Sequence, residues 1–391
     1  MTALYLKKDR ERPVLRGHPW IFSGAVERSE GDINEVGVAD VFDYKKNWLA
    51  RGLYNPKSQL VVRLLTWKKD PIDREFFIRQ LKRAVDFRGA YFSPATDAYR
   101  IVNGEGDFLP GLIVDRYGDY LVCQLFTAGI ELFKDDIIAA LTELTQPSGI
   151  YERSEGRVRR EEGLTDSVGA LAGEAPPELI TIQENSHKLL VDIRAGQKTG
   201  FFLDQRDNRA FLATLAHDKS VLNCCSYTGG FSVYAFTAGA KGVVTFDSSH
   251  PALEIAEKNL ELNGVAETKR ELIKGDAFAY LKESDQTFDV IVLDPPSLAH
   301  KRSDVDAATG GYKFLNMHAL KRLNPGGTLL TFSCSQHLPA DLFQKVVFGA
   351  AVDAGRKATI LARLGAPPDH PVSLHHPEGE YLKGLALRVL D

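Results

Sequence analysis

Cysteine supplies the strongest nucleophile among the side chains, and this chain has four: Cys123, Cys224, Cys225 and Cys334. None is spaced as C-x-x-C, so the sequence predicts neither a structural zinc site nor a disulfide. Cys334 follows an apolar, β-prone run, TLLTFS, at residues 328–333. A lone cysteine there is most often a small core residue, but a thiol at an open strand end can also serve as a nucleophile. Both interpretations are open at this point.

Three aspartates stand at the ends of β-prone runs: Asp247, Asp276 and Asp294. Each alone would be interpreted as a helix N-cap. A loop with two glycines, Asn223–Phe231, precedes them, although it matches neither the G-x-G-x-x-G fingerprint nor a phosphate-binding loop. An acid that ends the second strand can accept hydrogen bonds from both hydroxyls of a ribose. The loop and the three acids together favour a nucleoside-type cofactor.

The elements that would position these residues alternate between strand and helix from about residue 191 onward. We expect strands at residues 220–225, 242–247, 289–294 and 328–333, and helices at 250–264 and 311–327. This alternation predicts an α/β domain with a doubly wound, mostly parallel sheet. Ligands of such sheets bind at the carboxyl ends of the strands, which is where Cys334 and the three aspartates fall.

The first half of the chain has a different organisation. Short β-prone runs separated by Gly, Pro and Asn up to about residue 70 predict a small β-barrel. Helical periodicity at residues 73–87, strands at 100–126 and a helix at 129–145 predict an α+β middle domain. Residues 163–178 are rich in Gly, Ala and Pro, which favours a loop or linker. We therefore expect three domains, at residues 1–70, 71–190 and 191–391.

The overall composition bounds the class of protein. With 44% apolar residues and no apolar run of membrane-spanning length, the sequence is typical of a soluble globular protein. The charged N-terminus lacks the features of a signal peptide, so we expect a cytoplasmic location. The net charge of −4 argues against a nucleic-acid binder that is basic throughout. Two local clusters are either solvated surface or polyanion sites: Lys7, Lys8, Arg10, Arg12 and Arg16, and Arg153, Arg157, Arg159 and Arg160.

Several motifs resemble those of a known family. NCCSYTGGFSVYA (223–235) and DPPS (294–297) are similar to motifs of class I S-adenosylmethionine-dependent methyltransferases. GQKTGFFLDQR (196–206), GGYKFLN (310–316), FSCS (332–335) and PEGEYLKG (377–384) narrow the resemblance to bacterial 23S ribosomal RNA cytosine-C5 methyltransferases of the RlmI type. RGHPWIFSGAV (16–26) resembles the RNA-binding PUA domain that begins those proteins. The resemblance covers the whole chain and implies a seven-stranded methyltransferase sheet preceded by a PUA-like barrel.

The resemblance implies S-adenosylmethionine as the cofactor. Its methionine and ribose would lie against Asn223–Phe231, its ribose on Asp247 and its adenine on Asp276, while Thr199–Arg206 would close over the site. The implied cofactor-binding residues are Phe201, Gln205, Asn223, Ser226, Tyr227, Thr228, Gly229, Phe231, Asp247, Ser248, Asp276, Ala277, Asp294 and Pro295. Paired aromatics such as Phe201 and Phe202 are usually core residues, and that interpretation stays open.

The same resemblance implies that Cys334 is the catalytic nucleophile, adding to carbon 6 of a cytosine, and that Asp294 binds the base. Ser297 stands where amino-methylating enzymes carry an aromatic residue, which argues against an exocyclic amine as the target. The implied product is 5-methylcytidine, and the implied partner is 23S ribosomal RNA. Glu378 is either the base that removes the carbon-5 proton or a loop acid. A homodimer is a further expectation.

Two other functions stay open from the sequence. A methyltransferase on this scaffold could instead act on guanine or uracil. A guanine nitrogen needs no cysteine nucleophile, whereas uracil accepts the same attack on carbon 6. A non-catalytic RNA-binding assembly factor would keep the fold, but the complete glycine loop and the three aspartates argue against it.

Overall fold

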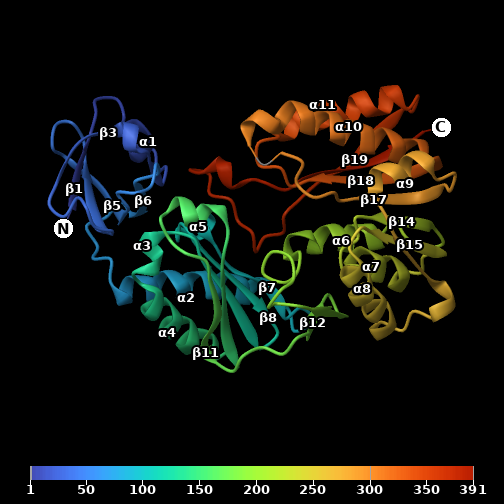
Figure 1. The fold of residues 1–391 in the computed structure, drawn as a ribbon, viewed down its shortest axis with the longest axis horizontal. Coiled ribbons are helices and arrows are strands. Elements are labelled where there is room, and N and C mark those ends of the chain that lie inside the picture. The colour runs from blue at the N-terminus through green and yellow to red at the C-terminus, as the bar shows by residue number, and fades with distance from the viewer. Residues whose placement is uncertain (1, 300, 391) are drawn as a thin grey trace. The chain divides into compact units, whose positions relative to one another are not determined.

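The computed structural model describes residues 2–299 and 301–390 of the chain (Figure 1). The chain forms two compact units. Unit 1 comprises the chain up to Ile180, Asp192–Phe201 and Pro368–Gly379, and unit 2 comprises Thr181–Val191, Phe202–Pro367 and the chain from Glu380 onward. Among the described helices, none has the length and apolar character that crossing a membrane requires. The expected domain boundaries at residues 70 and 190 stay a prediction.

Unit 1 begins with a small β domain, whose six strands form one sheet in the order β2-β6-β5-β4-β1-β3. The strands are β1 (Thr2–Leu6), β2 (Trp20–Ile21), β3 (Val26–Glu30), β4 (Gly37–Phe42), β5 (Trp48–Tyr54) and β6 (Val62–Thr66), and a short helix, α1 (Arg12–Leu15), precedes β2. Alternate residues of β1 are buried, so that Leu4 and Leu6 pack with Val41 and Val62 in one core. This period of two is the pattern that predicted strands here.

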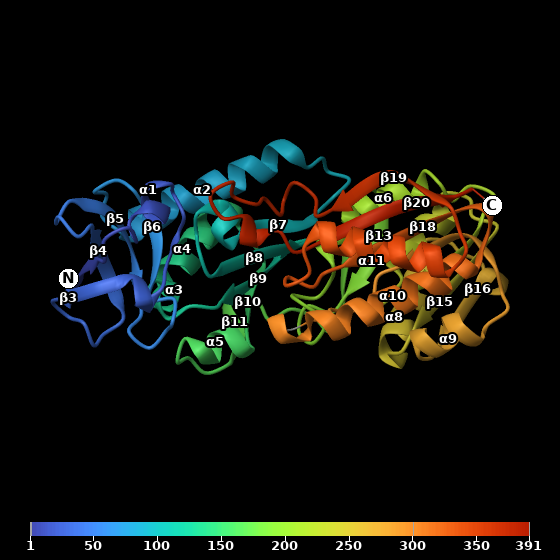
Figure 2. The ribbon, with the colours of Figure 1, turned by 90° about the horizontal axis from the view of Figure 1, so that it is seen from above.

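An α+β layer follows in unit 1. Its five-stranded sheet has the order β11-β10-β9-β8-β7 (Figure 2). The strands are β7 (Ala98–Asn103), β8 (Leu112–Tyr117), β9 (Tyr120–Leu125), β10 (Gly149–Ser154) and β11 (Ser167–Gly173), and the helices are α2 (Arg74–Tyr91), α3 (Ala128–Glu131), α4 (Lys134–Thr145) and α5 (Arg157–Glu161). Phe77 and Leu81 of α2 share one buried cluster with Ile137 and Leu141 of α4, which forms the core of this layer.

Two predictions for this layer are wrong. Residues 163–178, expected as a loop or linker, contain the edge strand β11, and the helix expected at 129–145 is divided into α3 and α4. β11 pairs with β10 from Ser167, opposite Ser154, to Gly173, opposite Gly149. Gly and Ala are weak strand formers, but an edge strand needs few large side chains when a neighbour supplies its hydrogen bonds. Long-range pairing therefore overrides the composition of the segment.

Unit 2 is built on a seven-stranded sheet with the order β16-β15-β14-β17-β18-β20-β19. Its strands are β14 (Ser220–Cys224), β15 (Gly242–Asp247), β16 (Arg270–Lys274), β17 (Phe288–Leu293), β18 (Leu323–Ser333), β19 (Ala358–Gly365) and β20 (Lys383–Val389). The neighbours from β16 to β18 pair in parallel, and β20 runs antiparallel to β18 and β19. A hairpin of β12 (Ile180–Glu184) and β13 (His187–Val191) precedes the sheet. The mostly parallel sheet predicted from the sequence is confirmed.

Helices cover both faces of this sheet. α6 (Arg206–Ala213), α7 (Gly230–Thr237) and α8 (His250–Leu262) lie on one face, and α9 (Ala277–Glu283), α10 (Val305–Lys321) and α11 (Ala340–Asp353) lie on the other (Figure 1). In α8, Ser249 caps the first turn by accepting a hydrogen bond from the backbone N–H of Ala252, and Leu253 and Leu260 are buried. The apolar spacing that predicted α8 is therefore its buried face.

The predicted end of one helix is wrong. The helix expected at 311–327 is α10, which ends at Lys321, and β18 begins at Leu323. The Asn-Pro-Gly-Gly segment lies in an irregular part of β18, because Phe288 pairs with Leu323 whereas Val290 pairs with Thr328. Proline has no backbone donor and is confined to such irregular positions or to edges in a sheet. The segment therefore begins a strand rather than ending a helix.

A buried ion pair joins three elements of unit 2. Arg209 of α6 and Glu184 of β12 are 2% and 0% exposed, and Nη2 of Arg209 lies 2.6 Å from Oε2 of Glu184. The hydroxyl of Tyr234, on α7, donates to the same carboxylate at 3.0 Å. Burial alone would lower the pKa of the Arg209 guanidinium, but the charge of Glu184 outweighs it and the pKa is raised. The pair thus fixes α7, the helix that the glycine loop leads into.

Removing one partner of this pair should destabilise the unit. We expect Arg209→Met to lower the free energy of unfolding of unit 2 by about 3–5 kcal/mol, because the Glu184 carboxylate would stay buried without its partner. Denaturant titration of the full chain measures this change. Lys345→Met, which breaks an exposed pair with Asp341 on α11, is the control and should leave stability almost unchanged. Equal, small effects of the two substitutions would contradict the prediction.

Candidate active site

The carboxyl edge of the unit 2 sheet brings several predicted residues together. Cys224, at the end of β14, pairs with Phe246 of β15 and with Leu293 of β17. Leu293 in turn pairs with Thr331 of β18. The strands are parallel, so the residues that follow these pairs in the sequence emerge at the same edge: Cys225, Asp247, Asp294 and Cys334.

The loop between β14 and α7 has an unusual backbone. Cys225 and Tyr227 have φ angles of 63° and 50°, in the left-handed region that residues other than glycine seldom occupy, and Gly229 follows with 77°. Such conformations persist where the surroundings fix them, often at ligand sites. Here the backbone N–H of Tyr227 donates to Oδ2 of Asp247 at 2.7 Å. The loop is thereby tied to the end of β15.

Two buried oxygens of this loop have no hydrogen-bond partner among the described residues: Oδ1 of Asn223 and Oγ1 of Thr228. Both residues are otherwise held in place. Nδ2 of Asn223 donates to Oγ of Ser232, and Nδ2 of Asn259 donates to the carbonyl of Thr228, both at 2.9 Å. A buried polar atom without a partner costs about 1–3 kcal/mol. A polar ligand seated in the loop would remove this cost.

Asp294 is held by a chain of amide hydrogen bonds. It follows β17 and is half-buried. Nε2 of Gln205 donates to Oδ2 of Asp294 at 2.8 Å, and Oε1 of the same amide accepts from Nδ2 of Asn208 at 2.6 Å. Because both ends of the Gln205 amide are engaged, its donor is directed at the carboxylate. The arrangement orients the Asp294 carboxylate.

The other predicted cofactor residues of unit 2 have varied positions. Asp276 accepts a hydrogen bond from the backbone N–H of Ala279 at 2.9 Å and is the N-cap of α9, as the simpler interpretation predicted. The side chain of Phe231 is in the core, with its ring 6.0 Å from that of Phe332. Ser226 and Pro295 are buried, Ala277 is half-buried and Ser248 is exposed.

Two predicted residues belong to unit 1. Phe201 is buried there, and its backbone N–H donates to the hydroxyl of Tyr117 at 3.2 Å. That hydroxyl also shares a hydrogen bond of 2.8 Å with Oγ1 of Thr199, so the segment that contains both residues is fixed on β8. The carboxylate of Glu378 lies 3.5 Å from Nε2 of His18. Its role as a base stays a prediction.

The thiols at the sheet edge differ in their surroundings. Cys224 is buried, whereas Cys225 and Cys334 are half-buried. The pKa of Cys225 lies well above its usual value, because the thiol is hydrogen-bonded to Cys224, is shielded from water and faces Asp247 and Asp294. A thiol held in its neutral form is a poor nucleophile. Cys225 is therefore unsuited to attack.

One residue that the sequence reasoning did not single out is Lys383 of β20. Its side chain is buried, and its ammonium donates to the carbonyls of Ser335 and Leu338 at 2.7 and 2.8 Å. Both carbonyls belong to the loop that follows Cys334. In the sequence this lysine belongs to the motif PEGEYLKG, but the motif does not indicate which groups the lysine contacts.

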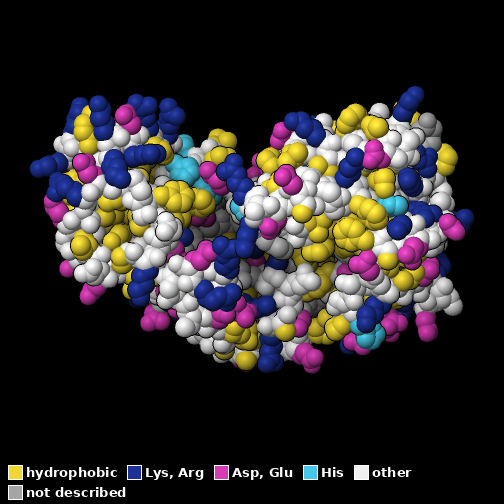
Figure 3. Space-filling model, turned by 45° about the horizontal axis from the view of Figure 1, so that its top comes forward, with side chains coloured by type: hydrophobic (Ala, Val, Ile, Leu, Met, Phe, Trp, Pro, Cys, Tyr) yellow, Lys and Arg dark blue, Asp and Glu magenta, His cyan; other side chains and the backbone are white. Residues whose placement is uncertain are grey.

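The two predicted basic clusters differ from each other. The cluster from Lys7 to Arg16 is exposed, and Figure 3 shows Lys and Arg side chains gathered over the N-terminal β domain. The second cluster is no open patch, because Arg159 is buried and binds Glu131 at 2.8 Å. Its other members also have acidic partners: Arg153 with Glu155, Arg157 with Glu161 and Arg160 with Asp166. The solvated-surface interpretation fits the second cluster better.

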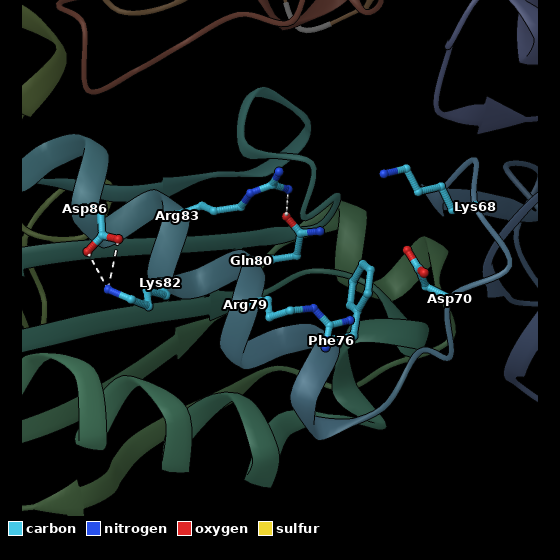
Figure 4. Close-up of a pocket in the computed structure, with 8 residues that line it drawn as sticks. All are labelled: Lys68, Asp70, Phe76, Arg79, Gln80, Lys82, Arg83 and Asp86. Atoms are coloured by element: carbon cyan, nitrogen blue, oxygen red, sulfur yellow. Dashed lines mark hydrogen bonds and ion pairs between the residues drawn. The ribbon is translucent and has the colours of Figure 1, made fainter.

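A further basic surface lies between the segment after β6 and helix α2 (Figure 4). This groove, of about 430 Å³, is lined by Lys68, Asp70, Phe76, Arg79, Gln80, Lys82, Arg83 and Asp86. Lys82 is paired with Asp86 at 3.0 Å. The guanidinium of Arg79 lies 6.0 Å from the ring centroid of Phe76. Four cations against two carboxylates give the groove a local positive charge, which suits a polyanion.

Comparison with known proteins identifies the family. A PUA-like domain matches residues 4–67, and an S-adenosylmethionine-dependent methyltransferase domain matches residues 112–383. The ribosomal RNA large subunit methyltransferase I of Tolumonas auensis is 47% identical over 395 residues, covering 100% of both chains. The chain belongs to this methyltransferase family. The Escherichia coli relative of the same name is 46% identical over 396 residues, again covering 100% of both chains.

Solved structures agree with this assignment. A methyltransferase in complex with SAH has a TM-score of 0.87 at 26% identity, covering 100% of both chains. An S-adenosylmethionine-dependent methyltransferase from Streptococcus mutans has a TM-score of 0.85, also at 26% identity over 100% of both chains. The predicted fold class, a PUA-like domain before a methyltransferase sheet, is confirmed.

The cofactor of the family is S-adenosylmethionine, as predicted, and the unit 2 edge fits it. Among the described residues, the buried oxygens of Asn223 and Thr228 have no hydrogen-bond partner, and the Asp247 carboxylate binds the same loop through the backbone N–H of Tyr227. These residues would hold the cofactor, which when bound supplies an electrophilic methyl group.

Substitution of Asp247 should weaken cofactor binding. We expect Asp247→Asn to raise the dissociation constant for S-adenosylmethionine at least about tenfold, since hydrogen bonds to a charged group contribute about 1.5–3 kcal/mol. Isothermal titration calorimetry measures this constant. Asp289→Asn is the matched control, because Asp289 lies at the opposite end of β17 and binds Ser220 and Asn324. Similar affinities of the two variants would contradict the assignment.

Proposed function

We propose that this protein methylates carbon 5 of a cytidine in large-subunit ribosomal RNA, with Cys334 as the nucleophile. The observation that carries the proposal is the half-buried Cys334 at the same sheet edge as the glycine loop and Asp294. The names of the relatives support the RNA substrate. They do not state which base is modified, so the cytosine target rests on the chemistry of the site and on the FSCS resemblance.

The thiolate of Cys334 is proposed to add to carbon 6 of the base, forming a carbon–sulfur bond. Carbon 5 is a poor nucleophile in the free pyrimidine, and the addition makes it enamine-like. It can then accept the methyl group that bound S-adenosylmethionine would supply, leaving S-adenosylhomocysteine. A base then takes the carbon-5 proton, the electron pair re-forms the 5,6 double bond and the carbon–sulfur bond breaks. The thiolate is regenerated. Covalent addition replaces one difficult step with several easier ones.

Asp294 is proposed to accept a hydrogen bond from the cytosine amino group. Its carboxylate is already oriented by the donor of Gln205 at 2.8 Å. A carboxylate fixed at this position would hold the base in place for attack on carbon 6. A uracil would present an oxygen acceptor where cytosine presents the amino donor, so a carboxylate acceptor favours cytosine.

RNA is proposed to contact two basic surfaces of unit 1. The first is the exposed N-terminal cluster on the PUA-like domain, and the second is the groove beside α2 (Figure 4). Neutralising phosphates with Lys and Arg supplies most of the affinity of such contacts without sequence selection. In this proposal these surfaces bind the RNA backbone, and the sheet edge of unit 2 selects the base.

Covalent trapping tests the target base and the nucleophile together. Wild-type protein is incubated with S-adenosylmethionine and ribosomal RNA containing 5-fluorocytidine, and the products are separated on a denaturing gel. Fluorine on carbon 5 cannot leave as a proton, so the adduct should persist. We expect a protein–RNA band with the wild type, none with Cys334→Ala, and an unchanged band with Cys123→Ala, which removes a buried thiol of unit 1.

Other outcomes of this assay separate the alternatives. A band with 5-fluorouridine RNA, and none with 5-fluorocytidine RNA, would assign the enzyme to uracil. Methylation of unmodified RNA by Cys334→Ala at the wild-type rate, with no adduct in either protein, would make Cys334 a core residue and point to a guanine nitrogen. Cofactor binding without methylation of ribosomal RNA or subunits would favour an assembly factor.

Charge reversal in the groove should weaken RNA binding. We expect the double substitution Arg79→Glu and Arg83→Glu to raise the dissociation constant for ribosomal RNA at least about tenfold, and to reduce the salt dependence of binding by about 0.7–0.9 per lost phosphate contact. Filter binding over a salt series measures both. The control reverses two exposed helix lysines of unit 2, Lys258 and Lys345. An equal loss in the control would mean that only net charge matters.

A further inference from the structure

The loop that carries Cys334 is held in place by the buried ammonium of Lys383. Lys383 begins β20 and pairs with Ser333, the residue before Cys334. From there its ammonium donates to the carbonyl of Ser335 at 2.7 Å and to that of Leu338 at 2.8 Å. The lysine therefore binds two carbonyls of the turn that follows Cys334. In the sequence, Cys334 lies between Ser333, which is the strand partner of Lys383, and Ser335, whose carbonyl accepts a hydrogen bond from Lys383.

Ser335 is fixed by further contacts. Its side chain is 0% exposed, and its Oγ lies 2.9 Å from the hydroxyl of Tyr312 and 3.0 Å from Oγ of Ser297. The same oxygen accepts a hydrogen bond from the backbone N–H of Ala299 at 3.2 Å. Residues from β20, α10 and the DPPS segment thus converge on the residue after Cys334. This fixes the backbone of the loop, while the thiol itself is only half-buried.

The charge of Lys383 acts on the thiol as well. A buried lysine is rare unless it is paired, yet among the described residues no carboxylate lies within ion-pair distance of this ammonium. Burial lowers the pKa of Lys383 below its usual value, and attraction to Cys334 and to Glu380 offsets part of this lowering. The attraction is mutual, so an ammonium that is favoured by a thiolate favours the thiolate in turn. Tyr312, whose pKa is raised by burial first and by Cys334 as a smaller cause, adds no competing charge in its neutral form.

Cys225 provides an internal comparison at the same sheet edge. It is half-buried like Cys334, and its pKa is raised by the hydrogen bond with Cys224, by burial and by the charges of Asp247 and Asp294. Carboxylates disfavour the thiolate, and an ammonium favours it. The two thiols thus differ in a charged neighbour, because the ammonium of Lys383 interacts with Cys334.

We propose that Lys383 is a positioning residue that fixes the Cys334 loop and stabilises the thiolate of Cys334, so that the thiol loses its proton to solvent before the base is attacked. This inference rests on the proposed function of Cys334. It names the group, left unassigned by the sequence, that activates the nucleophile. Lys383 forms no bond to the substrate in this account, and its effect is transmitted through Cys334.

The pH dependence of Cys334 alkylation tests this role without RNA and without turnover. The full-length protein is treated with iodoacetamide over a pH series, and alkylation is read by mass spectrometry on the tryptic peptide from Leu323 to Lys345, which contains no other cysteine. In Lys383→Met and Lys383→Gln we expect the midpoint to rise by about one pH unit or more. At neutral pH the rate should fall about tenfold. Lys383→Arg should restore part of the shift.

The variants separate charge from packing. Lys383→Gln keeps a hydrogen-bond donor without the charge, so its shift would assign the effect to the cation even if Lys383→Met unfolds. Arg388→Met removes a cation from the far end of the same strand, where Arg388 is exposed, and should leave the midpoint unchanged. Each variant is first checked for its thermal transition and for binding of S-adenosylmethionine.

Two results would overturn the proposal. A folded Lys383→Gln with the wild-type midpoint would make the lysine purely structural, and an equal shift in Arg388→Met would reduce the effect to net charge. Failure of the proposed function is seen separately, because it requires that Cys334→Ala still methylates RNA, whatever the alkylation profile is. Normal trapping by the wild type together with an unshifted Lys383→Gln profile would reject the role of Lys383 alone.

Discussion

The register of the parallel strands β15, β14, β17 and β18 is the constraint on which the site depends. The strands are buried on both faces: Leu222 and Ile291 belong to the core under one helical layer, and Val221 and Val292 to the core under the other. A slip of one residue would exchange these two sets. Because the burial of both faces fixes the register, it also fixes which residues emerge together at the carboxyl edge. The glycine loop, Asp294 and Cys334 meet for this reason and not because they are near in sequence.

Charge is divided along this edge. The ends of β15 and β17 carry carboxylates, Asp247 and Asp294, which suit a cationic sulfonium cofactor. They add to the hydrogen bond with Cys224 and to burial in raising the pKa of the Cys225 thiol. The end of β18 lies beside the ammonium of Lys383, which is supplied by the antiparallel strand β20. A thiolate and a sulfonium must be present together for the proposed chemistry. Carboxylates at some strand ends favour the sulfonium, and the ammonium beside the end of β18 favours the thiolate. One sheet edge can therefore favour both charged groups at the same time.

Local features of the sequence predicted where the glycine loop and Asp247 lie in the fold, while their roles in cofactor binding stay a prediction. A glycine loop after a strand and an acid at the end of the next strand are short-range patterns, and Asp247 does bind the loop backbone. Contacts between distant segments were beyond such reasoning. Lys383 binds a loop about 48 residues earlier in the chain, and Gln205 binds Asp294 across about 89 residues. For the same reason composition gave the wrong answer for β11, whose hydrogen bonds come from a partner strand, and for Arg159, whose burial no local pattern indicates.

The chain passes from unit 2 into unit 1 and back just before the strand that carries Lys383. The chain leaves unit 2 after Pro367, contributes Pro368–Gly379 to unit 1 and returns at Glu380, just before Lys383. Within unit 1 this segment is held by Trp20 of the PUA-like domain, whose ring lies 4.3 Å from that of His376. Loosening of that contact would act on the chain immediately before the strand that carries the cation. A fragment confined to unit 2 would cut this connection on both sides. The proposed role of Lys383 is therefore to be tested on the full chain.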